Sequence, residues 1–183
     1  MSTSGASRAG VDIQAERLGF RVITMAPELA TATVVNLASG TAVYQLVYAP
    51  SAFTLTQLAM EIRGAGATST GANTMAAYTV AGVLIGETAD MTAAFSAANA
   101  WAVGAVAGAP TVPAGPFYIG ALTHFTTPPT TYTTAHGGGG GVSVQPVNSR
   151  YPTIFAAGVT NFPASFTPSG LSLNSGGYIM AAK

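Results

Sequence analysis

From Thr41 onward, short apolar segments recur along the chain, and Gly, Pro, Asn and Ser residues separate them. This spacing is typical of antiparallel sandwiches and barrels. The segments predicted to be strands are residues 41–49, 53–63, 75–80, 83–88, 99–106, 116–125, 153–159 and 177–182. Eight strands is the number in a jelly roll. We therefore predict an all-β fold, a jelly-roll-like antiparallel β-sandwich of about eight strands, as a single domain over residues 37–183.

The segment 53–63 fits two patterns. Leu55, Leu58 and Ile62 lie at the spacing of one helical face. As a strand, the segment changes its apolar face near Thr56 and needs a β-bulge there. The β-rich surroundings favour the strand.

The segment 116–125 carries apolar side chains on both faces. Phe117 and Ile119 alternate with Tyr118 and Leu122, and successive residues of a strand point to opposite faces. This pattern predicts a central strand, or a strand whose outer face meets a neighbouring subunit.

Gly82 predicts a tight hairpin turn between the apolar segments 75–80 and 83–88, because glycine supplies the positive φ of such turns.

Residues 1–36 differ from the rest of the chain. They hold six of the twelve charged residues, the last of them at Glu28. Their apolar residues include Val22 at helical spacing, but Gly19 and the β-branched residues that follow it argue against a long helix. We interpret residues 1–36 as a partly extended N-terminal arm ahead of the domain. The alternative is a simple first strand preceded by a tail.

Residues 126–150 form the clearest predicted loop. They contain Pro128 and Pro129, then His136 and the five glycines 137–141. Prolines block regular strand pairing, and glycines raise the entropy that ordering must overcome. Loops of this length within a compact domain tend to be functional or disordered.

Charged side chains are scarce, and residues 91–149 contain none. Only 7% of the residues are charged, against about a quarter in an ordinary soluble domain. Acid–base, nucleophilic and metal chemistry depend on such groups, so we predict that the protein is not an enzyme and has no cofactor. The formal net charge is zero, so the sequence lacks the excess of basic residues that is typical of nucleic-acid-binding proteins. A net charge of zero also removes a usual defence against association, which favours a homo-oligomer.

Cysteine is absent, so the redox compartment cannot be inferred. The first residues lack the apolar stretch of a secretory signal. The longest apolar run, residues 100–109, is too short to span a bilayer. We therefore expect a protein that is made in a cytoplasm, does not enter a membrane, and stays soluble or joins an assembly.

The spacing of histidines and carboxylates in the sequence does not favour a metal site or a hydrolytic site. The two histidines, His124 and His136, have no carboxylate near them in the sequence, so we predict no metal site and a hydrogen-bonded ring for His124. Glu87 and Asp90 could form a carboxylate pair for glycoside hydrolysis. We favour a structural role for them, at the end of a strand and as the cap of a short Ala-rich helical turn.

Aromatic residues offer a possible glycan platform. Trp101 and Tyr132 are the candidates for glycan contact, because sugars stack on exposed rings. Most aromatic residues of the chain fall in predicted strands, where packing against neighbouring strands is their ordinary role. We therefore favour packing over glycan binding.

Two segments resemble a known family. Residues 75–88 are similar to a hairpin with tyrosine followed by glycine and two apolar residues in the small jelly-roll domains of tailed-bacteriophage virion proteins. Residues 112–122 are similar to their proline-x-glycine turn and the tyrosine-rich strand after it. The resemblance covers residues 41–125, and the richness in Ala, Gly and Thr looks like that of phages with actinobacterial hosts of high GC content.

The resemblance implies a non-enzymatic structural protein of the virion, made in the host cytoplasm. It implies a homotrimeric ornament bound to phage major capsid or tail proteins, and the short chain favours a capsid decoration protein. The alternatives are a minor tail, collar or baseplate protein and a glycan-binding receptor-recognition module. An arm of this kind would contact the virion through Arg8, Arg17 and Arg21.

Overall fold

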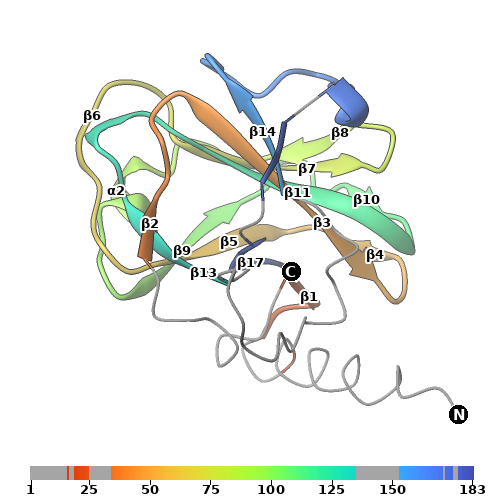
Figure 1. Cartoon of the computed structure of the whole chain (residues 1–183). Coiled ribbons are helices and arrows are strands. Elements are labelled where there is room, and N and C mark those ends of the chain that lie inside the picture. Colours follow the sequence, from red (N-terminus) through yellow and green to blue (C-terminus); the bar gives the residue numbers. More distant parts are fainter. Residues whose placement is uncertain (1–15, 17–18, 25–33, 135–152, 171, 175–176) are drawn as a thin grey trace, which may run out of the picture.

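The computed structural model describes residues 16, 19–24, 34–134, 153–170, 172–174 and 177–183 (Figure 1). These residues form an all-β fold in which antiparallel sheets pack as a sandwich. The predicted fold class is therefore confirmed. The two large sheets form its layers, with β5, β9 and β17 in one and β3, β7 and β11 in the other.

One layer is a four-stranded sheet in the described residues. Its strands, in spatial order, are β1 (Val22–Ile23), β17 (Met180–Ala182), β5 (Gln57–Ile62) and β9 (Ala100–Ala105). The other layer has six described strands. In spatial order they are β15 (Ser172–Asn174), β14 (Thr153–Ala157), β3 (Thr41–Ala49), β11 (Gly115–Thr123), β7 (Thr74–Thr79) and β8 (Leu84–Glu87). Along the chain, successive strands alternate between the two layers in the order β3, β5, β7, β9 and β11; the hairpin strand β8 is the exception. This crossing pattern is jelly-roll-like.

Smaller elements complete the described part of the chain. The short strands are β16 (Gly177–Tyr178), β13 (Thr130–Thr134) and β2 (Val34–Asn36) in one sheet, β12 (Phe125–Thr127) and β6 (Ala67–Ser69) in a second, and β10 (Thr111–Val112) and β4 (Phe53–Thr54) in a third. The helices are α2 (Thr92–Phe95) and the 3-10 turn η2 (Pro168–Gly170). None of the helices in the described residues is long and apolar enough to cross a membrane.

Strand β11 is the central strand that its two apolar faces predicted. It pairs along its length with β3 on one side and with β7 on the other. Phe117 and Ile119 point into the space between the layers, whereas Tyr118 and Leu122 pack on the outward face of the sheet. Both faces are covered within this chain, so the alternative of an outer face open to a neighbouring subunit is not needed for β11.

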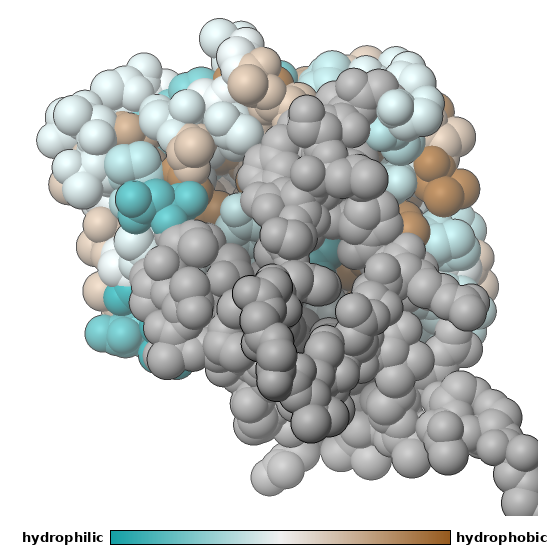
Figure 2. All heavy atoms as spheres, viewed as in Figure 1, coloured by the Kyte–Doolittle hydropathy of each residue, from teal (hydrophilic) through white to brown (hydrophobic). Residues whose placement is uncertain are grey.

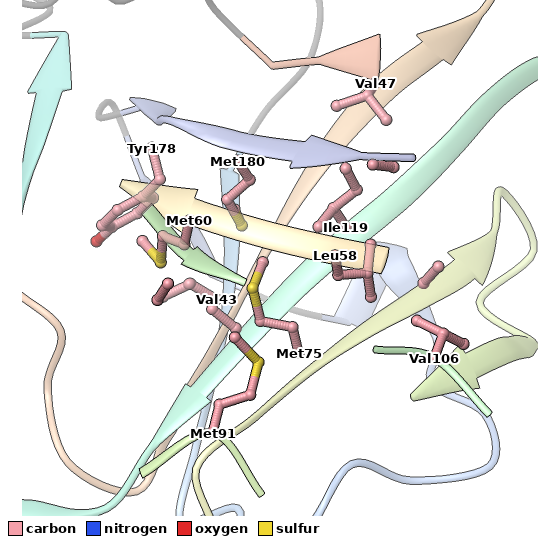
Figure 3. Close-up of a cluster of buried hydrophobic side chains, with 14 of the residues drawn as sticks. Val43, Val47, Leu58, Met60, Met75, Met91, Val106, Ile119, Tyr178 and Met180 are labelled. Carbon is pink, nitrogen blue, oxygen red and sulfur yellow. The ribbon is translucent and has the colours of Figure 1, made fainter. Parts of the chain in front are cut away.

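The space between the layers holds the main core (Figure 3). Leu58 and Met60 of β5 and Met180 of β17 meet Met75 of β7 and Ile119 of β11 there. Each of these side chains is fully buried. The alternate residues of each strand supply this core, as the period of two in a β-strand requires.

An outer aromatic cluster covers the other face of the six-stranded sheet. Tyr44, Tyr78 and Tyr118 lie on three different strands, and Phe162 and Phe166 pack on them from the segment 159–168. The ring centroids of Tyr44 and Phe166 are 4.3 Å apart and nearly stacked, with 29° between the planes. The sheet thus has a second buried face that the rest of the sandwich does not cover.

The segment 53–63 is extended, which confirms the strand that its β-rich surroundings favoured. Its two strands belong to different sheets. β4 pairs with β10, whereas β5 pairs with β9 and β17. The change occurs at Leu55 and Thr56, whose N–H groups donate to the carbonyl oxygens of Pro110 and Lys183. The predicted change of face near Thr56 is therefore a passage between sheets.

The predicted loop 126–150 needs a correction. Residues 126–127 belong to β12, and residues 130–134 form β13, which pairs with β2 and β16. The prolines occupy only the two-residue break between these strands, and the Pro129 carbonyl accepts the N–H of Leu37. β-branched threonines then favour an extended chain. The glycine-rich remainder, residues 135–150, lies outside the described residues.

The predicted arm, residues 1–36, also needs a correction. Phe20, Val22 and Ile23 are buried, and β1 is the edge strand of the four-stranded sheet. β2 belongs to the three-stranded sheet. Both strands belong to the fold, and the apolar side chains of residues 20, 22 and 23 are covered there. This favours the alternative of a first strand; residues 1–15 lie outside the described part.

Candidate functional site

The charged side chains in residues 34–134 take part in structural contacts. Glu61 lies on β5 and forms an ion pair with Arg63 at 3.2 Å. Burial raises the pKa of the Glu61 carboxyl, and the positive charge of Arg63 partly offsets that rise. Among the described residues on the face shown in Figure 2, most are pale and few are strongly hydrophilic.

Glu87 and Asp90 also hold the fold together. Glu87 accepts a hydrogen bond from the Thr74 hydroxyl at 2.9 Å. Asp90 accepts from the N–H of Asn73 and from the hydroxyl of Thr92, both at 2.9 Å. Asp90 does not cap α2 as predicted, because the N-cap residue is Met91 and no side chain there bonds to the helix. Its carboxylate instead ties the helix to the start of β7.

Asn73 is the centre of this polar network and is fully buried. Its side-chain N–H₂ lies within hydrogen-bond distance of Ser69 Oγ, Gly71 O and Thr92 Oγ1, at 2.7–3.0 Å. Its amide oxygen accepts the N–H of His124 at 2.6 Å. The prediction of a hydrogen-bonded ring for His124 is wrong, because its Nε2 is buried without a partner among the described residues. The Asn73 amide therefore joins the loop before β7 to α2 and to His124.

The two candidate glycan residues lie in different sheets. Trp101 is on β9, and its ring is partly buried against Phe20, with centroids 5.0 Å apart. Tyr132 is on β13, where its backbone lies opposite Val34, and its side chain is outside the described part. Nothing in the described contacts brings the two rings together.

Hydrogen bonds to the C-terminal strands hold residues 19–24, which we call the N-terminal strand segment. The N–H of Arg21 donates to Ala182 O and the N–H of Thr24 donates to Met180 O, both at 2.8 Å. The Thr24 hydroxyl donates to Tyr178 O at 2.5 Å and accepts the N–H of Met180 at 2.8 Å. The Thr24 side chain therefore adds two hydrogen bonds to the backbone bond that joins Thr24 to Met180.

Apolar contacts supplement these hydrogen bonds on both faces of the segment. Val22 enters the main core. Phe20 and Ile23 pack on the opposite face with Ala59, Ala181 and other small or apolar side chains, beside Trp101. Burying side chains of this size contributes about 1.5–3 kcal/mol each. The edge of β17 is therefore a surface that binds an extended apolar strand.

Of the predicted arm arginines, only Arg21 lies in the described residues. It is exposed, and together with Glu16 and Phe53 it lines an open cavity of about 460 Å³ beside residues 50–54. Arg8 and Arg17 lie outside the described part. The sequence pattern missed the role of Thr24 and of the β17 edge. The signal that could have found them is the β-branched run of residues 22–24.

The side chains considered as metal ligands are those in the part of the chain that the structure describes. No group of three or more His, Asp or Glu side chains there could hold a metal ion. No protein-family model matches the chain, and no curated protein matches its sequence. What the described geometry offers is a strand-binding edge and a charge-poor surface.

Proposed function

We propose that the protein is a non-enzymatic structural component of a tailed-phage virion, in the form of a homotrimeric capsid decoration protein. One observation carries the proposal: the four charged side chains in residues 34–134 are all engaged in contacts within the sandwich. A domain of this kind has few free charged side chains, and so little charge repulsion opposes its packing against other proteins. The resemblance of residues 75–88 and 112–122 to virion jelly rolls supports the same role.

Attachment to the virion is assigned to residues before Gly19. The N-terminal strand segment is part of the four-stranded sheet, so it is not free to reach a capsid protein. Arg8 and Arg17 remain the charged residues for that contact, whereas Arg21 is placed at the edge of the sandwich.

Rebinding to particles tests this proposal. Purified full-length protein and a variant lacking residues 2–18 are mixed with virions that lack the protein, and bound protein is measured after sedimentation. We expect the truncated protein to keep the fold and oligomeric state of the full chain and to lose binding to the particle. Arg21→Ala in the full chain is the matched control and should still bind. Undiminished binding by the truncated protein would contradict attachment through this segment.

The position on the particle distinguishes the capsid from the tail. Gold-labelled protein that rebinds to virions should appear on heads in electron micrographs. Label confined to tails would replace the capsid role with that of a minor tail, collar or baseplate protein. Absence of label from both would contradict the virion role itself.

A second candidate function is recognition of a host-surface glycan. Trp101 is only partly buried, and on the same face of β9 the side chain of Val103 is 41% exposed. A partly exposed indole ring is a common stacking surface for sugars. An array of host polysaccharides probed with the wild type and Trp101→Ala tests it, with Tyr132→Ala in parallel. Binding that Trp101→Ala leaves unchanged, or no binding at all, would exclude a Trp101 site.

A further inference from the structure

Strand β9 is an outer strand of the four-stranded sheet in the part of the chain that the structure describes. It pairs with β5 and with no other strand there. Its six residues make it longer than the other outer strands β1, β15 and β8, which have two, three and four residues. Outer strands of natural proteins are commonly kept short, charged or covered, because an open edge pairs with other chains. Among the described outer strands, β9 is therefore the one best suited to receive a further strand.

The backbone groups of Trp101 and Val103 point away from β5. Alternate residues of β5 face the other way, because the N–H groups of Gln57 and Glu61 donate to carbonyl oxygens within residues 179–183. The residues between them bond to β9 at its even-numbered positions. Along an antiparallel strand, residues that bond to one neighbour alternate with residues that face the opposite side. No hydrogen bond between described residues reaches the N–H and C=O groups of Trp101 and Val103.

The open edge of β9 covers residues 100–104. Before it, Asn99 has a φ of 53°, which lies outside the extended region and ends the strand. After it, Val106 forms an antiparallel bridge with Thr88, and such a bridge engages the residues next to it as well. A strand added at this edge therefore has room for one short pairing, centred on Ala102.

The side chains of the open edge match an inverted copy of themselves. Small residues at 100, 102 and 104 alternate with the larger apolar residues Trp101 and Val103. In an antiparallel pair with Ala102 at its centre, Trp101 of each copy lies opposite Val103 of the other. The two residues exchange two backbone hydrogen bonds there, so all the outward groups of Trp101 and Val103 in both copies are used. An aromatic ring opposite a β-branched side chain is also a stabilising cross-strand pair.

The charge of this region favours a second copy over an unrelated strand. Residues 91–149 contain no charged residue, and the open edge presents a partly buried Trp101 and a Val103 that is 41% exposed. A strand with charged side chains would lose water at this edge without gaining an opposite charge. A second copy brings the same uncharged apolar side chains, and contact through the same patch on both copies is the commonest arrangement in homo-oligomers.

We propose that the β9 edges of two copies pair antiparallel about Ala102, so that their four-stranded sheets become one continuous sheet. A two-fold contact of this kind cannot close a ring of three copies. In a homotrimer it joins copies that belong to two different trimers, and it requires neither the trimer nor a location in a virion. Within the pair, Trp101 is covered by the other copy, so this pairing and the glycan site at Trp101 exclude each other.

Analytical ultracentrifugation tests the pairing with lysine variants at two exposed valines. Val103→Lys places a charge against the Trp101 ring of the other copy, and we expect the mass of the assembly to fall to about half that of the wild type. Val80→Lys is the matched control and should keep the wild-type mass, because Val80 is 52% exposed and lies outside β9. Equal masses for the wild type and Val103→Lys, or the same fall in Val80→Lys, would overturn the proposal.

Amide hydrogen exchange on the wild-type protein gives a second measurement that does not depend on the folding of a variant. Ala102 lies opposite Met60 and bonds to β5 within the chain, so its amide should exchange slowly in every state. The amides of Trp101 and Val103 should exchange as slowly in the assembly and faster once dilution has separated the copies. Fast exchange of these two amides in the assembly, or protection that persists after the copies separate, would overturn the proposal.

The mass of Val103→Lys also separates this proposal from the proposed function. A hexamer in the wild type and a trimer in Val103→Lys are the expected result. A dimer in the wild type and a monomer in the variant keep the pairing and overturn the homotrimer. A trimer in both proteins overturns the pairing and leaves the homotrimer intact, and a monomer in both overturns the two together.

Discussion

The two apolar clusters of the sandwich are built in different ways. The main core lies between the two layers and consists largely of aliphatic, methionine and alanine side chains from alternate positions of the strands. The outer aromatic cluster lies on the far side of the six-stranded sheet and depends on Phe162 and Phe166, which come from outside the regular strands. The first cluster follows from strand alternation, whereas the second needs one particular segment to fold back over the sheet.

The clusters also differ in their polar atoms. In the outer aromatic cluster, the Tyr78 hydroxyl donates to Pro163 O at 2.8 Å. The Tyr44 hydroxyl is buried and has no hydrogen-bond partner among the described residues. A buried polar group without a partner costs about 1–3 kcal/mol. The Tyr44 hydroxyl therefore lowers the free energy of unfolding that the packing of the outer aromatic cluster would otherwise give.

Phenylalanine truncation should show the largest difference between the clusters. Phe117 is fully buried in the main core, whereas Phe166 is only partly buried at the surface of the outer cluster. We expect Phe117→Ala to lower the free energy of unfolding by about 3–5 kcal/mol, and Phe166→Ala by roughly half of that or less. Urea denaturation measures both. Equal losses would mean that the outer cluster is as integral to the fold as the main core.

Gly120 tests how closely the outer cluster packs on the sheet. A Cβ at this position would lie 2.9 Å from Tyr44 Cδ1 and 3.1 Å from Phe162 Cε1. We expect Gly120→Ala to destabilise the protein by about 1–3 kcal/mol, because two aromatic rings must move. Hydrogen exchange should show the loss concentrated in residues 159–168. An unchanged unfolding midpoint would show that the rings yield freely.

Removal of single hydroxyls should have opposite effects at two neighbouring tyrosines. Tyr78→Phe loses the hydrogen bond to Pro163 and should destabilise the protein by about 0.5–1.5 kcal/mol. Tyr44→Phe removes a hydroxyl that has no partner in the described part of the chain and should raise the stability, by about 1 kcal/mol. Each variant is the control for the other in the same denaturation series. A loss of stability in Tyr44→Phe would indicate that its hydroxyl is hydrogen-bonded in solution.

Alkaline pH should weaken the outer cluster by a smaller amount. Burial raises the pKa of Tyr44 from 10.0 to about 12. Between these two values the unfolded chain releases the proton and the folded chain keeps it, so the stability should fall as the pH rises. We expect the urea midpoint to decline between pH 10 and pH 12, and to decline less in Tyr44→Phe. Identical slopes in the two proteins would assign the decline to other groups.

Local pattern predicted much of the fold because it reports which faces of a strand are buried. The alternation in residues 116–125 predicted a central strand or a strand that faces a neighbouring subunit, and β11 is a central strand. The apolar residues of segment 53–63 fitted a helix as well as a strand, and the β-rich surroundings correctly favoured an extended chain. The prediction for residues 116–125 needed no knowledge of the partner strands, because the period of two is a property of the strand itself.

The missed elements are those whose burial depends on remote partners. Residues 130–134 carry threonines around a single tyrosine, and their pairing with β2 and β16 makes them a strand. The N-terminal strand segment likewise has a place only because the edge of β17 is there to receive it. Asp90 was recognised as structural, but its partner Asn73 is 17 residues away in the sequence and could not be identified from spacing.

The sequence by itself determined the fold class and the poverty of charge. Both are sums over local features, namely alternation, turn residues and the absence of ionisable side chains. Only the tertiary structure decided that Phe162 and Phe166 cover the tyrosines, that the Tyr44 hydroxyl has no hydrogen-bond partner among the described residues, and that residues 19–24 bind the edge of β17. These contacts join residues far apart in the chain, so register and packing select them from many pairings that local pattern permits equally.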